Sequence, residues 1–74
     1  MEFDYSKLLG RIREKGMTQQ SLSKELGIGL NSVNQKLTNK AYFKQQEIRR
    51  ICEILGIEDG EVGLYFFTQK VQKN

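Results

Sequence analysis

The sequence of 74 residues contains no histidine, no proline and no tryptophan, and it has a single cysteine, Cys52. Without histidine, one thiol cannot form a zinc site of the Cys/His kind or a Cys-His nucleophile pair. One thiol also cannot form an internal disulfide, which fits a reducing cytoplasm. No pair of acidic residues stands in a recognisable catalytic context. We therefore expect no enzymatic activity, no metal and no cofactor, and we assign Cys52 to the core.

Long apolar segments are also missing. No stretch approaches the roughly 18 apolar residues that a membrane span requires. The N-terminal sequence MEFDYSKLLG has neither the basic start nor the apolar core of a secretory signal. Because a chain of this size has room for one core, we expect a single domain over residues 1–74.

Charge is unevenly distributed, although the formal net charge is only +3. Residues 5–50 carry ten Lys or Arg against three Glu, whereas residues 51–74 carry four acids against two Lys. A concentration of cations in one part of a small fold raises the electrostatic potential of one face, which attracts a polyanion. The distribution of charge therefore favours a nucleic-acid partner.

The apolar residues recur at three- and four-residue spacing, in segments that glycine separates. This pattern predicts an all-α fold of five short helices. Asp4 is the expected cap of the first helix, which ends near Gly16. The next two helices cover about residues 18–26 and 30–38, and Gly27 supplies the left-handed residue that ends the earlier one.

The second half of the chain predicts two further helices. The fourth carries an apolar stripe that includes Ile48 and Ile51 and ends before Gly56, with Glu47 at its third position. The fifth begins near Glu58 and should be short, because two glycines weaken it.

Residues 65–74 form the expected tail, which is rich in aromatic residues and has β propensity. The tail can either cover the helical core or offer an edge to a second chain. For the second case, the candidate residues of a homodimer interface are Tyr65, Phe66, Phe67 and Val71.

One stretch, TQQSLSKELGIGLNSVNQKLTNK at residues 18–40, resembles the helix-turn-helix of the lambda-repressor-like, Cro/XRE class. The positions that carry the resemblance are Gln19 at the start of a helix, small Ser23 at the helix crossing, Gly27 in the turn, Ile28 after it and Val33 in the next helix. More loosely, the whole chain is similar to small Cro-like regulators of phages that infect Gram-positive bacteria. Lys36 departs from the pattern, because many members keep an apolar residue there.

The resemblance implies that the helix at residues 30–38 enters the major groove of double-stranded DNA. Its predicted base-reading residues are Leu30, Asn31, Ser32, Asn34 and Gln35. Its predicted phosphate-binding residues are Gln19, Lys40 and Lys44. Asn and Gln amides pair with adenine and Leu30 contacts a thymine methyl, so the expected site contains A·T pairs.

The resemblance further implies a homodimer that regulates transcription by occupying an operator in the bacterial cytoplasm, bound to the nucleoid. No small-molecule ligand and no membrane partner are expected. Two simpler interpretations stay open: the amide-rich face is merely solvated, with Lys40 and Lys44 as ordinary surface cations, and Leu30 closes the core. The competing function is a protein-interaction module of the same fold, such as an antirepressor or a sigma-factor ligand.

Overall fold

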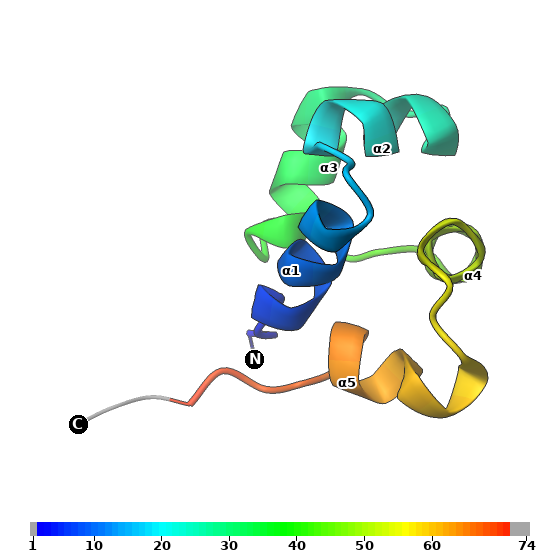
Figure 1. The fold of residues 1–74 in the computed structure, drawn as a ribbon. Coiled ribbons are helices and arrows are strands. Elements are labelled where there is room, and N and C mark those ends of the chain that lie inside the picture. The colour runs from blue at the N-terminus through cyan, green and yellow to red at the C-terminus, as the bar shows by residue number, and fades with distance from the viewer. Residues whose placement is uncertain (1, 72–74) are drawn as a thin grey trace.

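A computed structural model describes residues 2–71, which fold into five α-helices and one 3-10 turn (Figure 1). The elements are α1 (Ser6–Glu14), α2 (Gln19–Leu26), α3 (Leu30–Leu37), α4 (Gln45–Leu55), η1 (Asp59–Glu61) and α5 (Val62–Phe66). Within these described residues the only β pairing is one isolated antiparallel bridge, between Phe3 and Gln69. The predicted all-α fold with five helices is confirmed. No helix among residues 2–71 is both long and apolar enough to span a membrane.

Capping explains where α2 and α4 begin and end. The Thr18 hydroxyl accepts the Ser21 N–H at 3.1 Å, and the Ser21 hydroxyl accepts the Thr18 N–H at 2.9 Å, so two free donors of the α2 N-terminus are satisfied. Gly27 ends the helix with φ +69°, the left-handed region that glycine adopts without strain. At α4, the Glu47 carboxylate accepts the Lys44 N–H at 2.8 Å.

The start of α1 differs slightly from the prediction. Asp4 does accept the Ser6 N–H, at 2.8 Å, but the helix begins at Ser6 and Tyr5 occupies the cap position. Tyr5 instead belongs to the core. The hydrogen bonds from Ser6 to the Asp4 carboxylate lower the pKa of Asp4.

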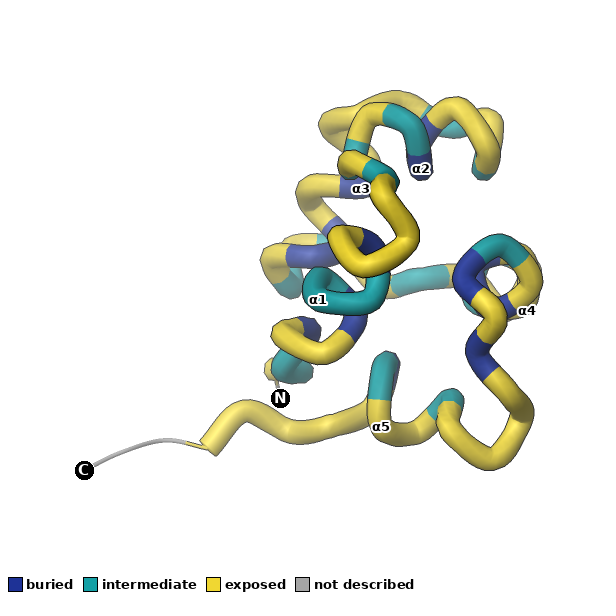
Figure 2. Tube along the Cα trace, viewed as in Figure 1, coloured by how far each residue is buried: buried dark blue, intermediate teal, exposed yellow. Residues whose placement is uncertain are grey.

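The core lies between the facing sides of the helices (Figure 2). Its buried apolar residues come from α1 to α5, from the residue before α1 and from the segment after α4: Tyr5, Leu8, Ile12, Leu22, Val33, Leu37, Ile51, Cys52, Leu55, Ile57 and Phe66. Burial raises the pKa of the Cys52 thiol, which keeps it protonated and unreactive. The assignment of Cys52 to the core is confirmed.

The prediction of an aromatic tail beginning at residue 65 is wrong at its start. α5 continues to Phe66, so Tyr65 and Phe66 are helical, and Phe66 is only 1% exposed. A side chain this buried packs in the helical core, the first of the two alternatives for the tail, and contributes almost no surface to a dimer interface. The β propensity of the aromatic run is overridden because Phe66 fills the core, where its ring lies 5.5 Å from that of Phe43. Phe67 and Val71 are exposed and Tyr65 is half-buried, while the predicted tail residues 72–74 lie outside the described part.

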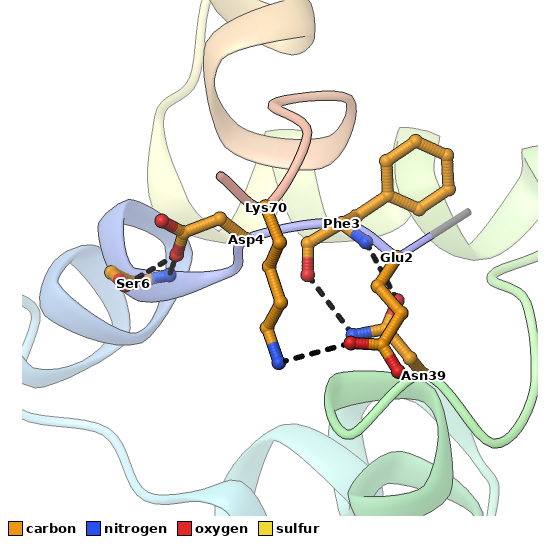
Figure 3. Close-up of polar contacts among 6 residues, drawn as sticks. All are labelled: Glu2, Phe3, Asp4, Ser6, Asn39 and Lys70. Carbon is orange, nitrogen blue, oxygen red and sulfur yellow. Dashed lines mark hydrogen bonds and ion pairs between the residues drawn. The ribbon is translucent and has the colours of Figure 1, made fainter. Parts of the chain in front are cut away.

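After α5 the chain pairs with the N-terminal segment (Figure 3). The Asp4 N–H donates to the Thr68 carbonyl at 2.7 Å and the Lys70 N–H donates to the Glu2 carbonyl at 3.0 Å. The Phe3 backbone points the other way, toward Asn39: the Asn39 side chain accepts the Phe3 N–H at 2.8 Å and donates to the Phe3 carbonyl at 3.0 Å. The N-terminal segment is therefore tied on one side to the C-terminal segment and on the other to Asn39, two residues after α3.

Asn39 combines this pairing with a left-handed backbone, at φ +67°. Its short amide tolerates that conformation and lets α3 end without a glycine.

We predict that Asn39→Gly costs about 1 to 2 kcal/mol of unfolding free energy, because it keeps the backbone freedom and loses the two hydrogen bonds. Asn39→Ala should cost roughly 1 kcal/mol more, because alanine adds left-handed strain. Urea unfolding of the two variants measures the difference. Equal losses would show that the backbone conformation contributes nothing, and a larger loss in the glycine variant would contradict the assignment.

Candidate nucleic-acid interface

Two short helices joined by a tight turn form the candidate interface. α2 and α3 pack against one another and are connected by the Gly27-Ile28-Gly29 turn. Ser23 is buried on α2, and its hydroxyl donates to the Gln20 carbonyl at 2.6 Å, so this buried polar side chain is not left unsatisfied. Val33 is fully buried on α3. This arrangement packs one side of α3 against α2 and leaves the other side of α3 exposed to solvent.

The five predicted base-reading residues all lie exposed on α3: Leu30, Asn31, Ser32, Asn34 and Gln35. Leu30 is 45% exposed, so it does not close the core. The exposed residues begin at the first turn of α3, the part of a recognition helix that approaches base edges. Their placement suits the predicted role, and the role itself stays a prediction.

Gln19 is placed beside this face. The Asn34 amide nitrogen donates to the Gln19 side-chain oxygen at 3.5 Å, which links the first residue of α2 to the middle of α3. With its oxygen engaged, Gln19 has its NH₂ group left to donate to an anion. The contact orients one predicted base-reading side chain with one predicted phosphate-binding side chain.

Lys40 and Lys44 lie exposed in the loop between α3 and α4. Among residues 2–71, six cations have no acidic group within ion-pair distance, and all six precede residue 45: Lys7, Arg13, Lys15, Lys24, Lys40 and Lys44. Several later cations are paired, such as Arg49 with Asp59 at 3.5 Å and Arg50 with Glu25 at 3.3 Å. The free positive charge is therefore concentrated in the half of the chain that contains α2 and α3.

Lys36 is the residue that sequence analysis did not explain. It is buried on the inner side of α3, and its ammonium group lies 2.6 and 2.5 Å from the two carboxylate oxygens of Glu47. Glu47 occupies the third position of α4 and also accepts the Lys44 N–H. One carboxylate thus connects the inner face of α3, the loop before α4 and the α4 N-terminus. The sequence signal was a lysine in an apolar position followed by an acid at the start of the next helix.

The charge state of Glu47 follows from these contacts. Burial raises the pKa of its carboxyl, but the hydrogen bonds from Lys36 and the Lys44 N–H, with the charges of both lysines, outweigh burial and lower it below 4.5. The carboxylate is therefore ionised at neutral pH and pairs with the Lys36 ammonium.

We predict that Glu47→Gln costs about 3 to 5 kcal/mol of unfolding free energy at neutral pH, because it leaves the Lys36 ammonium buried without its counter-charge. The double variant Lys36→Met with Glu47→Gln is the matched control and should recover most of the loss. Urea unfolding at pH 7 measures both. A double variant as unstable as the single one would show that charge pairing is not the cause.

The same pair predicts an acid dependence. Since the folded pKa of Glu47 lies below its ordinary value, its contribution to stability is complete above about pH 4.5 and is lost as the pH falls through the folded pKa. The stability difference between wild type and Glu47→Gln should therefore shrink steadily when unfolding is measured at decreasing pH. A difference that stays constant down to about pH 2 would contradict this prediction.

Comparison with known proteins relates this geometry to phage regulation. A similar solved structure is the solution structure of the modulator of repression (MOR) of the temperate bacteriophage TP901-1 from Lactococcus lactis, which is 36% identical, has a TM-score of 0.77 and is aligned over 97% of each chain. No curated protein matches. The family model described as "Protein of unknown function (DUF739)" matches residues 1–69. The chain therefore belongs to the DUF739 family, and it resembles a small regulatory protein of a phage.

Proposed function

We propose that this protein regulates repression in a temperate phage by binding double-stranded DNA through α3. The observation that carries the proposal is the exposed amide-rich face of α3, held outward by α2 in the half of the chain that contains the free cations. Similarity over the whole length to a modulator of repression supports the regulatory role. The proposal contains no catalytic step.

In this proposal α3 lies in the major groove with its first turns nearest the bases. Asn31, Asn34 and Gln35 carry amides that pair with the N6 and N7 groups of adenine, and each good contact discriminates by about 1 to 3 kcal/mol. Gln19, Lys40 and Lys44 bind phosphates and set the position of the helix. The lambda-repressor-like, Cro/XRE assignment is part of the same proposal.

A symmetric homodimer on a two-fold operator supplies the affinity that one small domain lacks. Phe67 and Val71, which are exposed, and Tyr65, which is half-buried, remain the proposed contact residues. The dimer acts by occupying an operator in the host cytoplasm.

A second candidate function is direct binding to a repressor protein. Two observations favour it: the outer face of α3 carries no charged side chain, since Lys36 is buried, and Leu30 is 45% exposed there. A face of amides with an apolar side chain suits a protein contact as well as a groove. The similar phage protein is named a modulator of repression and not a repressor, which also favours a protein partner.

We predict that wild-type protein binds random-sequence duplex DNA at low salt. The logarithm of the affinity should fall with the logarithm of the salt concentration at a slope of roughly −5 to −9, the range for a dimer that neutralises three to five phosphates per subunit. Electrophoretic titration measures this. Absence of binding at low salt would contradict DNA binding and leave the repressor as partner.

We also predict that Asn31→Ala and Gln35→Ala relax sequence preference in a selection from a random duplex pool, while their melting temperatures stay near that of wild type, because both side chains are exposed. Gln69→Ala, an exposed amide on the C-terminal segment, is the matched control and should keep the wild-type preference. Unchanged preference in both α3 variants would place base reading elsewhere.

A further inference from the structure

We propose that an aromatic cleft, separate from the α3 face, binds a protein segment that carries a leucine or aromatic anchor next to acidic residues. The cleft encloses about 220 Å³ and is lined by Ile48 and by six of the seven aromatic residues of the chain. Those six are Phe3, Tyr5, Tyr42, Phe43, Phe66 and Phe67. They come from the N-terminal segment, the loop before α4, and the end of α5.

Five of the six rings that line the cleft contact one another. Phe3 meets Phe67 edge to face at 5.8 Å, and Phe43 meets Tyr5 and Phe66 in the same way at 5.6 and 5.5 Å. The Phe3 backbone is held in turn by Asn39 (Figure 3). A cleft with walls already ordered loses little conformational entropy when it is filled.

The size of the cleft selects the kind of ligand. Pockets for drug-sized molecules and cofactors enclose about 300 to 1,000 Å³, so this cleft has room only for one or two large side chains. Two rings border it while largely open to water: Tyr42 is 75% exposed and Phe67 is 53% exposed. Covering them with a partner's apolar side chain removes this surface from water.

The positive charge beside the cleft favours a partner with acidic residues next to its apolar anchor. The loop at residues 38–44 supplies Tyr42 and Phe43 to the cleft, and it carries two exposed lysines, Lys40 and Lys44, and no acidic residue. Neither lysine is paired with an acid of the described chain. An apolar anchor that enters beside this loop is therefore favoured when Asp or Glu residues adjoin it.

The cleft is separate from the exposed face of α3, although the two lysines beside it are also among the proposed phosphate-binding residues. None of the five exposed α3 residues lines the cleft. Tyr42 has no part in the proposed base, phosphate or dimer contacts, so Tyr42→Ala should leave binding to duplex DNA unchanged.

The test uses isotope-labelled full-length protein and three synthetic peptides, observed by NMR. One peptide has a central Leu and Trp flanked by Glu, the second replaces each Glu with Lys, and the third replaces the central Leu and Trp with Ala. We expect saturable shifts at Tyr42 and Phe67 with the first peptide, and affinities at least about tenfold lower for the other two. Equal affinity for all three peptides, or no saturable binding of the first, would overturn the proposal.

Variants locate the binding site. Phe67→Ala and Tyr42→Ala should each weaken the Glu-flanked peptide by about tenfold or more. Leu64→Ala is the matched control, since Leu64 lies three residues before Phe67, is similarly exposed at 51% and does not line the cleft. Tyr42 is so exposed that its variant tests the proposal even if Phe67→Ala perturbs the fold. Unchanged affinity in both cleft variants would contradict the assignment.

Charge reversal tests the choice of partner. Lys40→Glu combined with Lys44→Glu should shift preference toward the Lys-flanked peptide, while Lys24→Glu, an exposed cation on α2, should not. Concentration-dependent dimerisation that Tyr42→Ala abolishes would show that a second copy of this chain fills the cleft, because Tyr42 lines the cleft and lies outside the proposed dimer contacts. Displacement of the peptide by single-stranded DNA would show that a nucleic acid occupies the cleft. Either result would overturn the proposal.

Discussion

The buried ion pair between Lys36 and Glu47 is the interaction on which the presentation of α3 depends. A lysine on the inner side of a short helix is costly to bury, and the cost is offset here because the carboxylate accepts from the ammonium at 2.5 to 2.6 Å and also from the Lys44 backbone. The same carboxylate satisfies a free donor at the α4 N-terminus. The pair therefore fixes how α3 is rotated, and with it which side chains face solvent.

A second set of polar contacts secures the other end of α3. Asn39 follows the helix in a left-handed conformation and binds both backbone groups of Phe3, while the segments around Phe3 and Gln69 pair with one another. The ion pair and this pairing together constrain α3, an eight-residue helix whose own hydrogen bonds would not hold it in place. The arrangement also creates two separate exposed surfaces, the amide-rich face of α3 and the aromatic cleft.

Much of the helical architecture was predictable because it depends on local chemistry. Thr18, Gly27 and Gly56 mark helix ends through hydrogen bonding and backbone conformation that neighbouring residues determine. The end of the chain was harder, because the aromatic run at residues 65–67 has β propensity, and only the space available in the core decides that Phe66 completes a helix. The helical periodicity predicted which residues of α3 are exposed, but exposure alone does not identify their function.

The contacts that sequence analysis missed join residues distant along the chain. Lys36 looked like a departure from an apolar pattern, and its partner eleven residues later was visible only as a helix-capping acid. Asn39 drew no prediction at all, and its pairing with Phe3 spans 36 residues. Periodicity and capping rules describe a helix and its ends, whereas these contacts depend on how the helices are packed.

The central claim is that α3 is held outward in order to enter a groove of DNA. It is tested most directly by mapping chemical-shift changes in labelled protein as a duplex selected from a random pool is added. The account predicts that the largest changes fall on Asn31, Ser32, Asn34 and Gln35, with smaller ones at Gln19 and Lys44. Changes confined to the aromatic cleft, or to the acidic segment at residues 58–61, would contradict it.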